Sequence, residues 1–204
     1  MRTWSAQEVG KFLALTADHP LHEVWVLLVT TGMRRGEALG LRWRDIDLEK
    51  RRVAVRQTVT VVDNKVQVSE PKSRRSRRVV ALDAGSIRTL SDLRARTPHR
   101  RPDELVFSSE GRPLNPTKVS KAFRKLVDQT DLARIRLHDL RHTHATLALQ
   151  AGIHPKIVSE RLGHSTISLI LDVYSHAVPN MQEEAAQRIG DLIFNDGRAA
   201  KPDY

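Results

Sequence analysis

The first part of the chain follows a helical pattern of apolar positions. Ser5 and Glu8 match a capping box, in which each side chain bonds an otherwise unpaired amide of the first helical turn. Nearly every position in residues 21–29 is apolar, which predicts a helix that is buried in the centre of the domain. Gly32 allows the left-handed backbone that ends such a helix, and a short helix is expected at residues 34–41.

The apolar pattern then changes to one that is typical of strands. Between residues 53 and 68 the chain is rich in Val and Thr at partly alternating positions, with a turn at Asp63-Asn64. This pattern predicts two strands, and a third strand is expected at residues 77–82, after a basic stretch. Three short antiparallel strands make a sheet that is too small to be a domain of its own.

The rest of the chain returns to helical patterns. We expect helices at residues 86–93, 117–128, 139–150, 155–162, 166–173 and 180–193, and a loop at residues 96–115. The fold class is therefore α+β and mainly α: a helical domain over residues 1–194 with a small three-stranded antiparallel sheet near its N-terminal third. The polar residues 195–204 are expected to form a flexible tail.

Composition narrows the partners and the chemistry. The chain has 204 residues and a formal net charge of +10, which favours a polyanion as its partner, with nucleic acid ahead of a membrane. No apolar run approaches the roughly 20 residues that span a bilayer, and no signal-peptide core follows the N-terminus. Cysteine is absent, which excludes disulfides, thiol catalysis and thiolate metal sites and fits a reducing compartment.

Two pairs of residues could bind a phosphate. His138 and Arg141 lie three residues apart at the start of a predicted helix, whose N-terminal field adds to their own charge. Taken alone, this pair is better explained as a helix-entry histidine and a surface arginine. Arg34 follows directly from the buried helix, and Glu37 can hold its guanidinium for bidentate phosphate contacts. An ordinary surface ion pair is the simpler explanation, but a buried helix seldom leads into charged residues without a reason.

Lys72 lies in a basic stretch between the second and third predicted strands. A hairpin tip at this place could reach into a DNA groove, and a lysine can transfer a proton whereas an arginine cannot. The solvated basic loop that we expect to follow the DNA backbone contains Arg74, Arg75, Arg77 and Arg78. Base contacts could also come from segments near Arg124 and Arg134, which the sequence does not rank.

Two further candidates lie near the C-terminus. His164 is on a predicted tight turn, where an imidazole can donate to a phosphate oxygen. Tyr174 lies ten residues further on and is one of only two tyrosines in the chain. Each signal is weak alone, because a turn histidine is usually structural and a lone tyrosine is more often half-buried in a core.

Taken together and in this order, two Arg, one Lys, two His and one Tyr resemble the tyrosine recombinase, or phage integrase, family. The resemblance covers residues 4–177, nearly the whole chain. It rests on four stretches: TGMRRGEALGLRWRDID, the PK before the third strand, LHDLRHTHATLALQAG and LGHSTISLILDVYSH.

The resemblance implies a role for each of these residues. Tyr174 would attack the scissile phosphate, giving a 3′-phosphotyrosine and a free 5′-hydroxyl, and the covalent bond would allow rejoining without ATP or another cofactor. Arg34 and Arg141 would brace the non-bridging oxygens in the transition state. Lys72 would protonate the departing 5′-oxygen, and His138 would assist proton transfer at the nucleophile. His164 would donate a hydrogen bond to the phosphate, and Glu37 would orient other groups rather than react. No metal is implied.

The resemblance also implies the partners. They would be double-stranded DNA and further copies of the chain, as a tetramer on DNA and a monomer or weak oligomer when free. It fits a bacterial or phage-encoded cytoplasmic protein and leaves open a directionality factor. Family members usually carry an N-terminal DNA-binding domain, whereas the motifs here start near residue 1. This points either to an excised catalytic domain or to a natural short form, and we favour the first. Such a domain is expected to bind DNA weakly and with strong salt dependence.

The last predicted helix carries an apolar stripe from Val178 to Leu192. In the family that this chain resembles, a segment at this place docks in a neighbouring protomer and couples the active sites. Packing of the stripe against its own domain is nearly as well supported by the pattern.

Three alternatives remain open at this point. A DNA-binding module that does not cut is disfavoured by the complete set of six residues. A type IB topoisomerase shares the phosphotyrosine chemistry, but the flanking stretches resemble those of integrases. A metal site at His138, His142 and His144 is suggested by their spacing, but the H-E-x-x-H pattern of zinc peptidases is absent.

Overall fold

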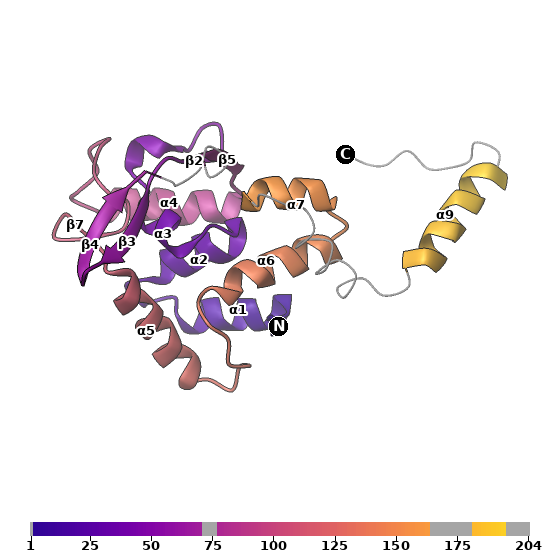
Figure 1. The fold of residues 1–204 in the computed structure, drawn as a ribbon, viewed down its shortest axis with the longest axis horizontal. Helices are drawn as coiled ribbons and strands as arrows, with labels where there is room; N and C mark the ends of the chain where they lie inside the picture. The colour runs from indigo at the N-terminus through magenta and orange to yellow at the C-terminus, as the bar shows by residue number, and fades with distance from the viewer. Residues whose placement is uncertain (1, 71–76, 164–180, 195–204) are drawn as a thin grey trace.

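The computed structural model describes residues 2–70, 77–163 and 181–194 (Figure 1). Its helices are α1 (Ala6–Leu15), α2 (His22–Thr31), α3 (Arg35–Leu39), α4 (Ala84–Arg96), α5 (Pro116–Asp128), α6 (Asp139–Gln150), α7 (Pro155–Leu162) and α9 (Met181–Phe194), with a 3-10 turn η1 (Trp43–Asp45). Its strands are β1 (Ile46–Asp47), β2 (Arg52–Val55), β3 (Thr58–Val62), β4 (Lys65–Ser69), β5 (Arg78–Ala81), β6 (Ser108–Ser109) and β7 (Arg112–Pro113). The predicted fold class, α+β and mainly α, is confirmed.

Helix α2 lies in the middle of the fold, with α1, α3, α4 and α6 packed around it (Figure 1). This arrangement confirms the prediction of a buried central helix. Trp25 of α2 is fully buried in an aromatic cluster that joins it to the N-terminal segment and to α5. The ring centroids of Trp4 and Phe12 lie 5.1 Å apart, and those of Trp25 and Phe123 lie 5.5 Å apart. Such aromatic contacts add to the large apolar area that these rings bury.

The strands form separate small sheets, which corrects the prediction of one three-stranded sheet over residues 53–82. The three-stranded sheet has the order β1-β2-β5, and all its pairings are antiparallel. Strands β3 and β4 form a hairpin apart from it, with Asp63 and Asn64 both at positive φ as a tight type I′ turn requires. Strand β1 and the β6–β7 hairpin were not predicted.

The chain leaves the first sheet between β2 and β3, and β3 packs against α3. Gln57, which lies between the two strands, donates from Nε2 to the carbonyl oxygen of Gly40 at the end of α3, at 2.7 Å. A Cβ atom at Gly36 would lie 2.5 Å from the carbonyl oxygen of Val59. The lack of a side chain at Gly36 therefore lets β3 pass directly over α3. These contacts join segments that are distant in the sequence, and a strand pattern does not reveal them.

Most helix positions agree with the sequence pattern. The capping box of Ser5 and Glu8 is present at the start of α1, and Gly32 ends α2 with φ of 65°. Helix α4 is longer than expected because Asp83 caps its first turn by accepting from the backbone N–H of Ser86 at 3.0 Å. The helix predicted at residues 166–173 and the tail at 195–204 lie outside the described residues.

Helix α9 lies apart from the other described elements (Figure 1). Four large apolar side chains of this helix are exposed: Ile189, Leu192, Ile193 and Phe194. Within the described ranges, the helices are too short or too polar to cross a membrane.

Candidate active site

The C-terminal ends of α2 and α7 meet at one place in the fold. Both helices end in a left-handed glycine, Gly32 with φ of 65° and Gly163 with φ of 66°. A Cβ atom at Gly32 would collide with the side chain of Leu162 and would lie 2.7 Å from His144 Cδ2. The carbonyl groups at a helix C-terminus carry partial negative charge, so two such ends attract cations.

Arg141 joins these two helix ends. Arg141 is a buried residue of α6, and its side chain reaches the ends of both α2 and α7. One guanidinium nitrogen donates to the Gly32 carbonyl oxygen and the other to the Leu162 carbonyl oxygen, each at 2.6 Å. Burial, followed by the charge of Arg34, lowers the pKa of Arg141 to about 9, so this guanidinium is charged at neutral pH. The group is a cation that is fixed in place before any ligand arrives.

Arg34 lies at the start of α3, directly after the end of α2. Its guanidinium donates to Glu37 Oε1 at 2.8 Å and, at 3.5 Å, to the carbonyl oxygen of Gly163. Its backbone N–H donates to the other oxygen of Glu37 at 2.9 Å. The side chain of Arg34 is 42% exposed, whereas that of Glu37 is 4% exposed. Arg34 therefore has one side held by protein and the other side open to a ligand.

Arg78 is the third cation at this place, and its position corrects the prediction of a solvated loop arginine. It is the first residue of β5, and its side chain is only 7% exposed. Its Nη2 and Nη1 donate to Glu37 Oε2 and Oε1 at 2.9 and 3.2 Å, and its Nε donates to the Arg161 carbonyl oxygen at 2.6 Å. Arg77, in contrast, is exposed and pairs with Glu70 at 2.5 Å.

Three consecutive carbonyl oxygens at the end of α7 therefore each accept from a different arginine. We call these arginines the arginine cluster: Arg34, Arg78 and Arg141. Burial raises the pKa of the Glu37 carboxyl, but hydrogen bonds and charge from Arg78 and Arg34 outweigh it and hold this pKa below its usual range. Glu37 is thus ionised at neutral pH and shared by two of the three arginines.

His138 lies beside the arginine cluster, at the start of α6. Its ring packs edge-on against that of His142, with centroids 5.1 Å apart. Burial, followed by the charge of Arg141, lowers the pKa of His138 below its usual value, so this imidazole is neutral at pH 7. A neutral imidazole can accept a proton as well as donate one.

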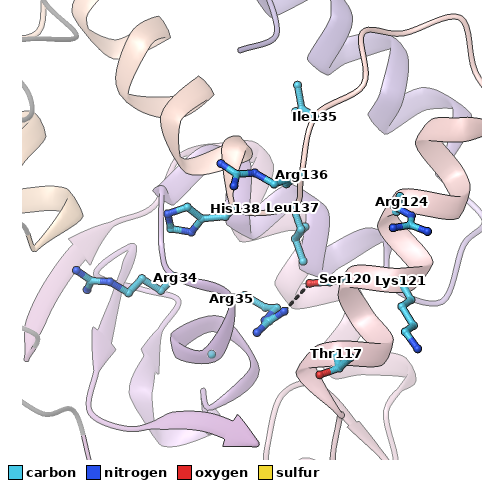
Figure 2. Close-up of a pocket in the computed structure, with 11 residues that line it drawn as sticks. Arg34, Arg35, Thr117, Ser120, Lys121, Arg124, Ile135, Arg136, Leu137 and His138 are labelled. Atoms are coloured by element: carbon cyan, nitrogen blue, oxygen red, sulfur yellow. Dashed lines mark hydrogen bonds between the residues drawn. The ribbon is translucent and has the colours of Figure 1, made fainter. Parts of the chain in front are cut away.

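A cleft of about 620 Å³ runs from this histidine to α5, and we call it the basic cleft (Figure 2). Arg34 and His138 lie on one side of it, and Ser120, Lys121 and Arg124 on α5 lie on the other (Figure 2). The remaining residues that line it are Arg35, Gly36, Thr117, Ile135, Arg136 and Leu137. Arg35 bridges the two sides by donating to Ser120 Oγ at 2.5 Å. A cleft rich in exposed cations suits a polyanion.

The α5 side of this cleft is only weakly indicated by the sequence. Val119, Phe123 and Val127 form the buried face of α5, and its exposed face contains Thr117, Lys118, Lys121, Arg124 and Lys125. That alternation is visible in the sequence, but such a cationic face is usually only solvated. Arg134, the other unranked candidate, is exposed and pairs with Asp128 at 3.1 Å.

Several predicted site residues lie outside the described residues: Lys72, Arg74, Arg75, His164 and Tyr174. Their roles stay predictions. His144, a member of the suggested metal site, is occupied elsewhere: its Nδ1 lies 2.9 Å from the Val29 carbonyl oxygen and must donate to it. Burial, followed by the charge of Arg161, lowers the pKa of His144 to about 4, so its ring is neutral.

Comparison with known proteins identifies the family. The sequence matches the model of the phage integrase family over residues 6–181. The chain belongs to this family. It is 31% identical over 218 residues to a tyrosine recombinase XerC-like protein of Caldanaerobacter subterraneus subsp. tengcongensis, and 31% identical over 206 residues to the ICEBs1 integrase of Bacillus subtilis. Each alignment covers 95% of this chain and 55% of the relative, so the chain spans about half the length of these relatives.

Solved structures of integrases share the fold. The Tn1549 transposon integrase in complex with circular intermediate DNA aligns with 92% of this chain and 67% of its own, with a TM-score of 0.81 at 22% identity. The catalytic domain of bacteriophage HP1 integrase aligns with 98% of this chain and 99% of its own, with a TM-score of 0.61 at 19% identity. The described fold is therefore that of an integrase catalytic domain.

Proposed function

We propose that this chain is the catalytic domain of a site-specific recombinase that cuts and rejoins double-stranded DNA through a 3′-phosphotyrosine. One observation carries the proposal. Arg34 and Arg141, which are 107 positions apart by their numbers, converge on the end of α7, and Arg34 and His138 line the basic cleft. A single phosphodiester bound beside the end of α7 would meet both guanidinium groups.

The arginines would stabilise the charge that develops on the non-bridging oxygens. Arg141 has more N–H groups than its two carbonyl partners occupy, and Arg34 has an exposed side. Donors that are fixed before the reaction need no reorganisation, and each is commonly worth about 3–4 kcal/mol in the transition state.

The covalent step would be carried by residues whose roles come from the family motifs. The Tyr174 hydroxyl oxygen would form a bond to phosphorus while the bond from phosphorus to the 5′-oxygen breaks. The phenol proton would leave through His138, and the 5′-oxygen would take a proton from Lys72. His164 would donate to the phosphate, Glu37 would hold Arg34, and rejoining would reverse these steps without a cofactor or metal.

Binding and assembly would involve more of the surface. The basic cleft would follow the DNA backbone, together with Arg74, Arg75 and Arg77. The active assembly would be a tetramer on DNA formed from monomers or weak oligomers, and a directionality factor could bias the reaction. The exposed apolar side chains of α9 support docking of this helix on a neighbouring copy.

The test uses a nicked duplex that carries the core attachment site, obtained from the junction between the integrated element and its host DNA. The chain should form a covalent complex with this duplex, and Tyr174→Phe should abolish the complex while DNA binding remains. A covalent complex in the Phe variant would show that another residue is the nucleophile.

A second substrate tests the proton donor. Lys72→Ala should slow cleavage, because the departing 5′-oxygen then leaves without a proton. Replacing this oxygen by sulfur, a better leaving group, should restore the rate. A variant that stays equally slow on the sulfur substrate would contradict the role of Lys72.

A further inference from the structure

Arg78 lies against both residues of the described part of the chain that accept from the Arg34 guanidinium. The side-chain acceptors of Arg34 among the described residues are Glu37 Oε1 and the Gly163 carbonyl oxygen. Arg78 donates to both oxygens of Glu37. Its side chain also runs beside Gly163, where an added Cβ would be 3.1 Å from Arg78 Cδ and Nη1.

We propose that Arg78 is a positioning residue, which fixes Glu37 and the end of α7 so that Arg34 faces the scissile phosphate. The inference rests on the proposed function and adds a residue to it. The side chain of Arg78 is almost fully buried, which fits a role that acts through Glu37 and α7 without direct contact with DNA.

The first physical reason is the charge on Glu37. A buried carboxylate is costly unless it is well paired. If Arg78 were absent, the Arg34 guanidinium would be the nearest partner able to neutralise Glu37, and it would be drawn inward. With Arg78 present, one carboxylate is shared by two arginines, so positive charge is left on Arg34 for a phosphate.

The second reason is the shape of the guanidinium group. Arg78 uses its Nη atoms on Glu37 and its Nε on the Arg161 carbonyl oxygen at the same time. A planar fork can do this, whereas a lysine ammonium is a single point of charge. The Arg161 carbonyl oxygen belongs to the last turn of α7, so β5, α3 and α7 are tied together through one side chain.

The experiment therefore keeps the positive charge at position 78 and removes the planar guanidinium group. Arg78→Lys is compared with the unmodified chain and with Arg52→Lys, a matched control on β2 whose side chain is half-exposed and pairs with Asp47. Three quantities are measured: the affinity for the nicked core duplex, the single-turnover cleavage rate at saturating duplex, and the mobility of the Arg34 Nε–Hε group by NMR relaxation without DNA.

We expect Arg78→Lys to bind the duplex as the control does but to cleave it roughly 10- to 100-fold more slowly, since a small misplacement of a catalytic group has an effect of this size. The Arg34 Nε–Hε group should become more mobile in this variant and stay unchanged in Arg52→Lys. Arg78→Gln serves as a second variant, and we expect at least the same loss of rate from it.

Three results would overturn the inference. They are a cleavage rate in Arg78→Lys equal to that of the control, a loss confined to DNA affinity, and loss of folding in both Arg78 variants, which would make Arg78 a residue of general stability. If the unmodified chain forms no covalent complex, the proposed function itself fails. The NMR comparison still decides whether Arg78 fixes Arg34 in that case.

Discussion

The arginine cluster and the basic cleft are two cationic regions that lie side by side and are built in opposite ways. In the cluster, Arg78 and Arg141 are buried, and their guanidinium groups donate to carbonyl or carboxylate oxygens. In the cleft, Lys121 and Arg124 are exposed on one helix face. Charges that stabilise one oxygen atom must be fixed, whereas charges that attract a long polyanion can remain mobile.

The strongest test of this difference is the loss of Arg141. Arg141→Ala removes a fixed donor and leaves two buried carbonyl oxygens without their partner. We expect the single-turnover cleavage rate on the nicked core duplex to fall on the order of 100- to 1000-fold. Thermal unfolding should also occur at a lower temperature, because buried polar groups that lose their partners are destabilising. A rate within tenfold of the unmodified chain would contradict the fixed role of this arginine.

Gly32 tests how tightly the cluster is packed. Gly32 and Gly152 both have positive φ, but an added Cβ at Gly152 would have nothing within 4 Å, whereas at Gly32 it would collide with Leu162 and His144. Gly152→Ala should lower the free energy of unfolding by about 1–2 kcal/mol through backbone strain alone. Gly32→Ala should lower it by about 3 kcal/mol or more, because overpacking adds to that strain.

Urea denaturation of both glycine variants measures this difference. Equal losses would mean that the ends of α2 and α7 can move apart, and the cluster would then not be rigid.

His144 predicts how the stability of this packed region depends on pH. Its pKa is lowered to about 4 in the folded chain by burial and Arg161, so the unfolded chain binds a proton more readily. The contribution of His144 to the free energy of unfolding is therefore complete above the unfolded pKa of about 6.5. It falls as the pH decreases from there toward 4. Between pH 7 and pH 5 we expect a loss of roughly 2 kcal/mol from this residue, with smaller losses in the same direction from His138 and His142.

The measurement is urea denaturation at the two pH values, together with an NMR titration of the His144 ring. His144→Asn should reduce the slope of stability against pH. A ring that titrates near pH 6.5 in the folded chain would contradict the buried neutral imidazole.

The smallest expected effect comes from the basic cleft. Lys121→Gln and Arg124→Gln should each weaken DNA binding by a similar factor on any sequence, because each removes one charge from an exposed face. The slope of log affinity against log salt should become shallower by about one for each change. Arg88→Gln on α4, an exposed arginine that lies away from the cleft, is the matched control. A salt slope that is unchanged in the cleft variants would exclude the cleft from the DNA contact.

The local parts of this architecture could be predicted from sequence. The capping box of Ser5 and Glu8 and the contact of Arg34 with Glu37 join residues three positions apart, so spacing alone indicates them. Helix α2 could be predicted because residues 24–29, in its middle, are all apolar.

The other parts depend on contacts between distant residues. Arg78 lies 41 positions from Glu37, and a run of arginines between two strands does not show which one turns inward. Arg141 lies 109 positions from Gly32, and the wide face of α5 becomes a cleft wall only when α3 packs beside it. The predicted grouping of the strands into one sheet was wrong for the same reason, because Gln57, between β2 and β3, bonds to Gly40 at the end of α3.

The central claim is that guanidinium groups neutralise the charge on one scissile phosphate. The most direct measurement compares Arg34→Ala with the unmodified chain on two nicked core duplexes, one with a normal scissile phosphodiester and one with a methylphosphonate there, which has no negative charge. The account predicts a fall on the order of 100-fold or more in cleavage of the phosphodiester and a much smaller fall on the methylphosphonate. An equal fall on both duplexes would contradict it.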